Sequence, residues 1–91
     1  MTYSLEYTAR TLQDLKGLDR QNSRRVTAGL KSLEAQELPW LHVKKLKTSA
    51  SPEPVYSFHV GSCRVLIEFD FERHRIFVDE VGPRKSSYRD F

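Results

Sequence analysis

The stretch VYSFHVGSCRVLIEFD, residues 55–70, predicts a β-hairpin and decides the fold. Apolar and polar residues alternate on both sides of Gly61-Ser62, a Gly-first pair that suits a two-residue type II′ turn. That turn places His59 directly opposite Arg64 on the neighbouring strand. The same register gathers the larger apolar side chains on the other face of the hairpin, so we expect that other face to be buried.

The residues before the hairpin predict one strand and two helices. Residues 2–7 alternate like a strand, and Thr8 and Asp19 can each cap a helix that follows. The loop around 17–19 is so short that the two helices should form an antiparallel hairpin. The expected apolar stripes are Leu12, Leu15 and Leu18 in the first helix, and Val26, Leu30 and Leu33 in the second.

The residues after the hairpin complete the predicted sheet. A run at 75–81 indicates a last strand that is antiparallel to 63–70, and residues 41–46 allow another short strand. The order of strand, two helices and strand meander predicts a two-layer α+β domain over residues 1–91. We expect an antiparallel sheet of four to five strands, with the N-terminal helical hairpin on one face.

Composition restricts the class of protein. The chain has 91 residues, of which 38% are hydrophobic and 30% charged, as in an ordinary globular domain and unlike a disordered chain. No apolar run approaches the roughly 20 residues of a membrane helix, and we expect no signal peptide. A single cysteine, Cys63, excludes a disulfide framework and favours a reducing cytoplasm.

Positive charge concentrates in two segments, although the formal net charge is only +3. Residues 42–47 hold three lysines and residues 82–89 hold three cations, and neither segment contains an acid. Such clusters can bind phosphate groups, or they can simply be solvated edges of the domain. If the last strand ends at Gly82-Pro83 beside Arg64, the second cluster can fold across the face of the hairpin that the helices leave open. The predicted result is a concave basic site.

The order of these residues resembles the RelE/ParE toxin superfamily of toxin–antitoxin systems. That superfamily has a hairpin of the type Tyr-x-Leu/Phe-x-x-Gly-x-x-Arg-Val, and a final strand that ends in Val-Gly-x-Arg and precedes a tyrosine. The matching positions here are Tyr56, Phe58, Gly61, Arg64, Val65, Val81, Gly82, Arg84 and Tyr88.

The resemblance to the RelE branch implies a toxin that is a metal-independent endoribonuclease and needs no cofactor. Such an enzyme cleaves messenger RNA, often on the ribosome, by attack of a ribose 2′-hydroxyl on the adjacent phosphate, and a cognate antitoxin silences it. The alternative is a ParE-like toxin that inhibits DNA gyrase, or a catalytically silent member that binds only its antitoxin. Retention of Arg64, Arg84 and Tyr88 favours the ribonuclease.

Each candidate site residue carries an expected role. By resemblance, Arg64 would hold phosphate charge, Arg84 would stabilise the transition state, and Tyr88 would stack on a base or transfer a proton. The RelE branch commonly has lysines at the positions of Ser57 and His59, and imidazole is well matched to acid–base work at neutral pH. The expected catalytic residues are His59, Arg64, Arg84 and Tyr88, and the expected RNA-phosphate ligands are Lys44, Lys45, Lys47, Ser57, Lys85 and Arg89.

Other chemically notable residues have structural interpretations. Arg64 could instead form an ion pair with Glu68 or Asp79. His42 and His74 are expected to be surface histidines. Trp40 and Cys63 are expected to belong to the core, Trp40 as a cap beneath the helices and Cys63 as a small buried residue. No residues are assigned to a metal.

Overall fold

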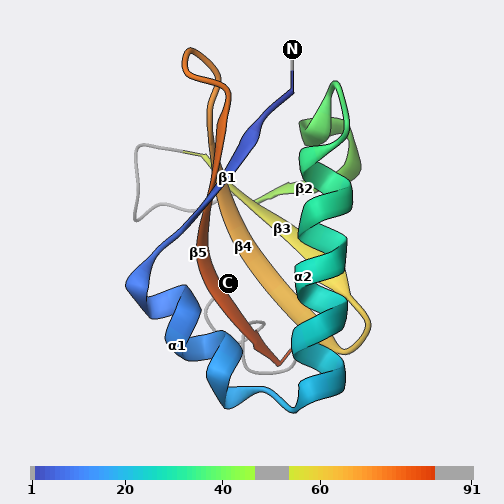
Figure 1. The fold of residues 1–91 in the computed structure, drawn as a ribbon. Helices are drawn as coiled ribbons and strands as arrows, with labels where there is room; N and C mark the ends of the chain where they lie inside the picture. The colour runs from blue at the N-terminus through green and yellow to red at the C-terminus, as the bar shows by residue number, and fades with distance from the viewer. Residues whose placement is uncertain (1, 47–53, 84–91) are drawn as a thin grey trace.

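A five-stranded β-sheet in this protein has α2 over one face and α1 along the edge of β5 (Figure 1). The structure, a computed structural model, describes residues 2–46 and 54–83. The expected α+β architecture, with two successive helices after the first strand, is confirmed. The elements are β1 (Ser4–Tyr7), α1 (Ala9–Gly17), α2 (Arg20–Glu34), the 3-10 helix η1 (Pro39–His42), β2 (Lys44–Leu46), β3 (Val55–Val60), β4 (Cys63–Asp70) and β5 (Arg75–Pro83).

The predicted hairpin forms in the predicted register. In the β3–β4 pair, Phe58 lies opposite Val65 and His59 lies opposite Arg64. Gly61 has a φ of 57°, a conformation that glycine adopts without the steric cost a side chain would bring. Ser62 is not among the positive-φ residues, as a type II′ turn requires.

The sheet has the strand order β1-β5-β4-β3-β2. β5 runs antiparallel to β4 as expected, and its last residues pair with the start of β4, Gly82 with Arg64 and Pro83 with Cys63. The sheet is nevertheless mixed, because β1 pairs with β5 in parallel. No tight turn joins these two strands, which are separated by the helices and three other strands, so local sequence does not dictate their relative direction.

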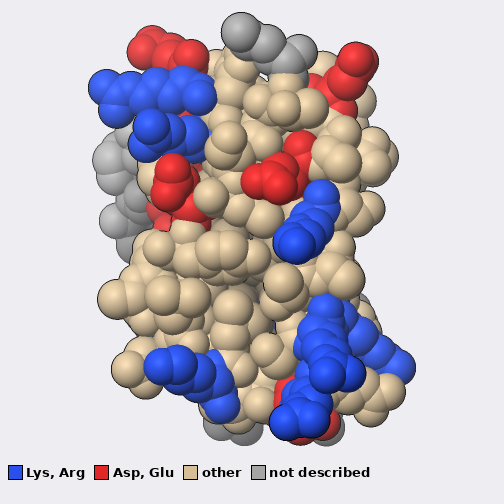
Figure 2. Space-filling view, viewed as in Figure 1, with Lys and Arg blue, Asp and Glu red and all other residues tan. Residues whose placement is uncertain are grey.

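The helices begin at the expected caps. The Thr8 side chain accepts from the Thr11 N–H, and the Asp19 side chain accepts from the Asn22 N–H. The predicted stripe of α2 is buried: Val26 and Leu30 are fully covered and Leu33 is 2% exposed. No helix among residues 2–46 and 54–83 is long and apolar enough to cross a membrane. Exposed arginines over the first half of α2 form a basic area on this side of the molecule (Figure 2); they are Arg20, Arg24 and Arg25.

α1 packs differently from the prediction, because it lies against the edge of the sheet. β1 pairs with β5 only over Arg75–Val78, so no strand of the described residues lies beside the second half of β5 on that side. α1 supplies polar partners there: the Thr11 hydroxyl donates to the Val78 carbonyl, and the Val81 N–H donates to Asp14 Oδ2 at 3.2 Å. Side chains of α1 thereby bind backbone groups along an edge that would otherwise be open.

This position changes which residues of α1 are buried. Thr11 is fully buried, whereas Leu12 is 51% exposed. Leu15 and Leu18 are partly buried and pack against the core. The apolar stripe predicted for the first helix is therefore wrong at Leu12, since the face of α1 that meets β5 is set by hydrogen bonds to the strand edge as well as by apolar contact.

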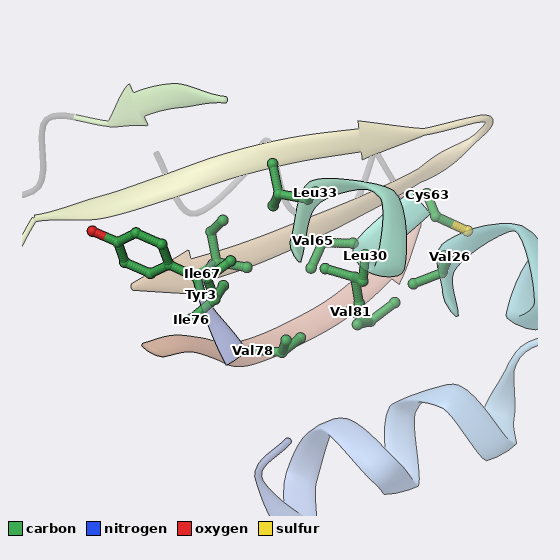
Figure 3. Close-up of a cluster of buried hydrophobic side chains, with 10 residues drawn as sticks. All are labelled: Tyr3, Val26, Leu30, Leu33, Cys63, Val65, Ile67, Ile76, Val78 and Val81. Carbon is green, nitrogen blue, oxygen red and sulfur yellow. The ribbon is translucent and has the colours of Figure 1, made fainter. Parts of the chain in front are cut away.

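The hydrophobic core lies between α2 and the helix-side face of the sheet (Figure 3). Cys63 belongs to it, as predicted, and Trp40 is half-buried against it. An aromatic cluster extends the core at one end, where Tyr3 meets the rings of Trp40 and Phe69, each with centroids 6.0 Å apart. The core residues are Tyr3, Val26, Leu30, Leu33, Cys63, Val65, Ile67, Ile76, Val78 and Val81.

Candidate functional site

The candidate site lies on the face of the β3–β4 hairpin that is turned away from the helices. Alternation along the strands puts Ser57, His59 and Arg64 on this face, because their neighbours Phe58 and Val65 point to the helix side. His59 is exposed, so its imidazole can meet a ligand from solvent. The sequence-predicted juxtaposition of His59 and Arg64 is present in the structure.

Arg64 is more enclosed than an RNA-contacting side chain was expected to be. Its side chain is on the open face of the hairpin, yet the residue is only 3% exposed. Gly82, its partner in β5, brings no side chain against it. A buried guanidinium keeps its charge, and its field is screened less than that of a cation in water. Arg64 therefore adds positive potential beside His59 in this conformation, with almost no exposure of its own to solvent.

The lysines of β2 divide between the two faces. Lys44 pairs with Ser57 and so shares the open face, whereas Lys45 pairs with Tyr56 on the helix side. Both lysines are exposed. Of these two predicted phosphate ligands, Lys44 is therefore the one placed with Ser57 and His59. Ser57 is 4% exposed, so it is part of the buried surface of this face.

A hollow of about 460 Å³ lies at the end of β2. It brings together Lys44, Ser57 and His59, which the sequence predicted for the site, with His42, which it did not. His42 is the last residue of η1 and lies two residues before Lys44. Lys44 pairs with Ser57, and His59 lies two residues after Ser57, so the register brings the two histidines to the same level. The β2–β3 register is the signal that could have found it. The hollow is lined by Leu41, His42, Val43, Lys44, Ser57, Phe58 and His59.

The other end of the open face is acidic. A register shift between Leu66 and Ile67 leaves Asp79 as an extra residue of β5, and its carboxyl is hydrogen-bonded to that of Glu68. Burial, together with the hydrogen bond and the negative charge of Glu68, raises the pKa of Asp79 to about 8. Both side chains line an acidic hollow of about 750 Å³ beside the β4–β5 turn. An anionic ligand would be repelled from this end of the face.

Several predicted site residues lie outside the described part of the chain: Lys47, Arg84, Lys85, Tyr88 and Arg89. The last described residue, Pro83, pairs with Cys63 at the turn end of β4. His74 is at the opposite end, in the β4–β5 turn, where its ring centroid lies 5.0 Å from that of Tyr3. Within residues 2–46 and 54–83, no three His, Cys, Asp or Glu side chains are grouped so that they could hold a metal ion.

The fold of this chain is similar to that of several solved structures. The RelE–RelB complex of Pyrococcus horikoshii OT3 has a chain that is 23% identical, with a TM-score of 0.73 over 92% of this chain and 97% of that one. The RelBE2 toxin–antitoxin complex of Mycobacterium tuberculosis has a chain that is 22% identical, with a TM-score of 0.68 over 92% and 100%.

A toxin solved without a partner is also similar. The isolated RelE toxin of Escherichia coli is 20% identical, with a TM-score of 0.65 over 97% of this chain and 93% of that one. No protein-family model and no curated protein sequence matches the chain. Since the structural likeness covers nearly the whole length of both partners, the chain has the fold of the RelE toxins.

Proposed function

We propose that this chain is the toxin of a type II toxin–antitoxin system and that it cleaves messenger RNA. The observation that carries the proposal is the direct cross-strand pairing of His59 with Arg64. His59 and Lys44 both line the hollow at the end of β2. The site combines an exposed imidazole with two cations on a fold that RelE toxins share. No carboxylate is among the described residues that line this hollow, so a phosphate can approach it.

The chemistry proposed is transfer within the RNA chain. The ribose 2′-oxygen bonds to the adjacent phosphorus while the bond from phosphorus to the 5′-oxygen breaks, giving a 2′,3′-cyclic phosphate and a free 5′-hydroxyl. A base takes the 2′-hydroxyl proton, an acid gives a proton to the leaving oxygen, and cations stabilise the added charge on phosphorus. His59 takes part in proton transfer, and Lys44 and Arg64 supply positive charge. Arg84 and Tyr88 stay predicted participants.

The proposed partners follow from the proposed role. Two of the similar structures are complexes of a toxin with its antitoxin, which supports a cognate antitoxin for this chain. We further propose that cleavage takes place on the ribosome, in the cytoplasm, where messenger RNA is translated. The exposed arginines of α2, together with Lys44 and Lys45, offer phosphate-binding charge on both sides of the molecule.

The burial of Arg64 favours a second candidate function. Arg64, as a residue that is 3% exposed, offers a phosphate almost no accessible surface in this conformation. A chain that only binds an antitoxin, or one that inhibits DNA gyrase as ParE-like toxins do, would not need that contact. The ribonuclease interpretation requires that Arg64 act through its field or become accessible when RNA binds.

The test is cleavage of message by the purified chain in the presence of ribosomes. We expect cuts at codon-related positions, with 5′-hydroxyl ends, and a fall of about 10²-fold or more in Arg64→Gln, because such charged groups contribute that much to a developing anion. Arg73→Gln, in the exposed β4–β5 turn, is the matched control and should cleave like the parent. Thermal unfolding of both variants checks that Arg64→Gln is folded.

Other outcomes of these measurements would contradict the proposed function or the role of Arg64. Intact message together with stalled gyrase–DNA complexes would support the ParE-like alternative. Intact message without gyrase poisoning, but with tight binding to a cognate antitoxin, would support the silent member. Equal cleavage by the two arginine variants would remove Arg64 from the mechanism.

A further inference from the structure

The hollow at the end of β2 is bordered by two histidines from different elements. β2 pairs with β3 only over Val55–Ser57, so the rest of β3 extends past the end of β2. η1 (Pro39–His42) comes just before β2, and its last residue, His42, lines the hollow. His59 borders the same space from β3. The antiparallel register carries His42 to the level of His59.

The side chains around the hollow have the composition that metal-independent RNA cleavage demands. The reaction needs one group that accepts a proton and one that donates a proton at the same time, and imidazole, with a pKa near about 6.5, does both at neutral pH. His42 and His59 are both exposed at the hollow, with Lys44 beside them. The volume, about 460 Å³, lies within the roughly 300–1,000 Å³ typical of ligand pockets.

We propose that His42 and His59 are the acid and base couple of an RNA-cleavage site, with the scissile phosphate bound between them over Lys44 and Ser57. This inference rests on the proposed ribonuclease function and adds His42 to it as a catalytic residue. One imidazole removes the 2′-hydroxyl proton as the 2′-oxygen bonds to phosphorus. The other, as imidazolium, protonates the 5′-oxygen as its bond to phosphorus breaks, so one proton is taken up and one is released.

The charges that face the two rings favour this assignment. Lys44 faces the hollow from β2, and Arg64 lies opposite His59 on β4. On the α2 side, the polar side chains that line a second hollow with His42 are the uncharged Ser32 and Gln36. Among the described residues that line the two hollows there is no carboxylate. A phosphate that enters the hollow therefore meets cations and imidazoles, with no described carboxylate in the lining to repel it.

The first experiment is the pH–rate profile for cleavage of a single-stranded RNA. The parent should show a bell-shaped profile, because one imidazole must be neutral and the other protonated. His42→Gln and His59→Gln should each lower kcat about 10²–10³-fold and each remove one limb of the bell. The control is His74→Asn, at the far turn, where Asn tolerates the φ of 55° and cleavage should be unchanged.

The second experiment reads binding without turnover. The imidazole NMR signals are followed during titration with the same oligonucleotide carrying 2′-deoxyribose at the cleavage position, which cannot react. The signals of His42 and His59 should move together and saturate at one RNA concentration, while the signal of His74 stays in place. A structural histidine at position 42 would not respond in this way.

The two experiments separate the inference from the proposed function. Cleavage by the parent with an unaltered bell in His42→Gln would overturn the role of His42 and leave the ribonuclease intact. Absence of cleavage by the parent would overturn both the ribonuclease and the acid–base couple. In that case joint movement of the two signals would retain the hollow as an RNA-phosphate site, and static signals would remove it.

Discussion

Asp79 shows how one extra residue in a strand creates an unusual ionisable group. The register shift leaves Asp79 between Glu80, which pairs with Leu66, and Val78, which pairs with Ile67. Glu80 forms an ion pair with Arg10, with a distance of 3.0 Å between Arg10 Nη2 and Glu80 Oε1. Asp79 instead shares a hydrogen bond with Glu68, a second acid, so one proton between the two carboxyls stabilises the folded state.

Stability should therefore depend on pH through Asp79. Its pKa is about 8 when folded and 3.8 in its ordinary state, so the unfolded chain loses this proton first. The free energy of unfolding should fall as pH rises from about 4 to about 8 and level off above that range. In Asp79→Asn this fall should be reduced by about 1 kcal/mol, since the pair is half-exposed and screened. Urea unfolding at pH 6 and pH 9 measures the difference.

The control for this measurement is Glu72→Gln, in the exposed turn after β4, which should keep the pH dependence of the parent. If Asp79→Asn and the parent lose the same stability between pH 6 and pH 9, the shared proton is not the cause. At the residue scale, the sequence offered Asp79 and Glu68 only as possible partners of Arg64. Their contact with each other depends on the bulge, which strand alternation does not reveal.

At the scale of elements, the β3–β4 hairpin is specified by residues that lie within a few positions of each other. Alternating apolar side chains determine which face of the hairpin is buried, and Gly61 determines the type of turn. The register therefore follows from the sequence. The N-caps of both helices are equally local, because Thr8 and Asp19 each bind an N–H three residues ahead. These features were predictable because each depends on a short stretch of chain.

The two glycines at element ends give a matched test of this local control. Gly61 has a φ of 57°, so Gly61→Ala should destabilise the protein by about 1–2 kcal/mol. Gly17 ends α1 without a positive φ, and a Cβ built there meets nothing within 4 Å. Gly17→Ala should therefore be neutral or stabilise by up to about 1 kcal/mol. Chemical denaturation gives both values, and a larger loss at Gly17 would contradict the turn assignment.

At the scale of the whole molecule, stability comes from the layer between α2 and the sheet. Leu30 is fully buried in that layer, whereas Leu12 on α1 is 51% exposed, although both belong to apolar stripes in the sequence. The difference arises because α2 lies over the sheet face and α1 lies along the edge of β5. Periodicity identifies an amphipathic helix but does not say which neighbour its apolar side will meet.

The two leucines should therefore respond differently to truncation. Leu30→Ala should cost about 3–4 kcal/mol of unfolding free energy, because it removes buried methyl groups and leaves a cavity. Leu12→Ala removes the same atoms from a half-solvated position and should cost about 0.5 kcal/mol or less. Urea denaturation of both variants at one pH provides the comparison. Similar losses would mean that Leu12 is part of the core after all.

The candidate site also has some features that local sequence predicts and others that depend on tertiary contacts. The meeting of His59 with Arg64 was predictable, because both belong to one hairpin with a tight turn. The enclosure of Arg64 was not, since burial depends on the whole fold. The joining of His42 to His59 and the separation of Lys44 from Lys45 were not either, since they depend on where β2 pairs and where η1 ends. Arg84 and Tyr88 stay predictions, because they lie outside the described residues.

The sequence by itself determined the two α-helices with their caps, the β3–β4 hairpin with its register and the buried face of α2, since each follows from hydrogen bonds and side-chain contacts between residues close along the chain. Only the tertiary structure decided that β1 runs parallel to β5, that Thr11 is buried in place of Leu12, and that two histidines border one hollow. These outcomes depend on contacts between segments far apart in sequence, whose free energies compete across the whole molecule.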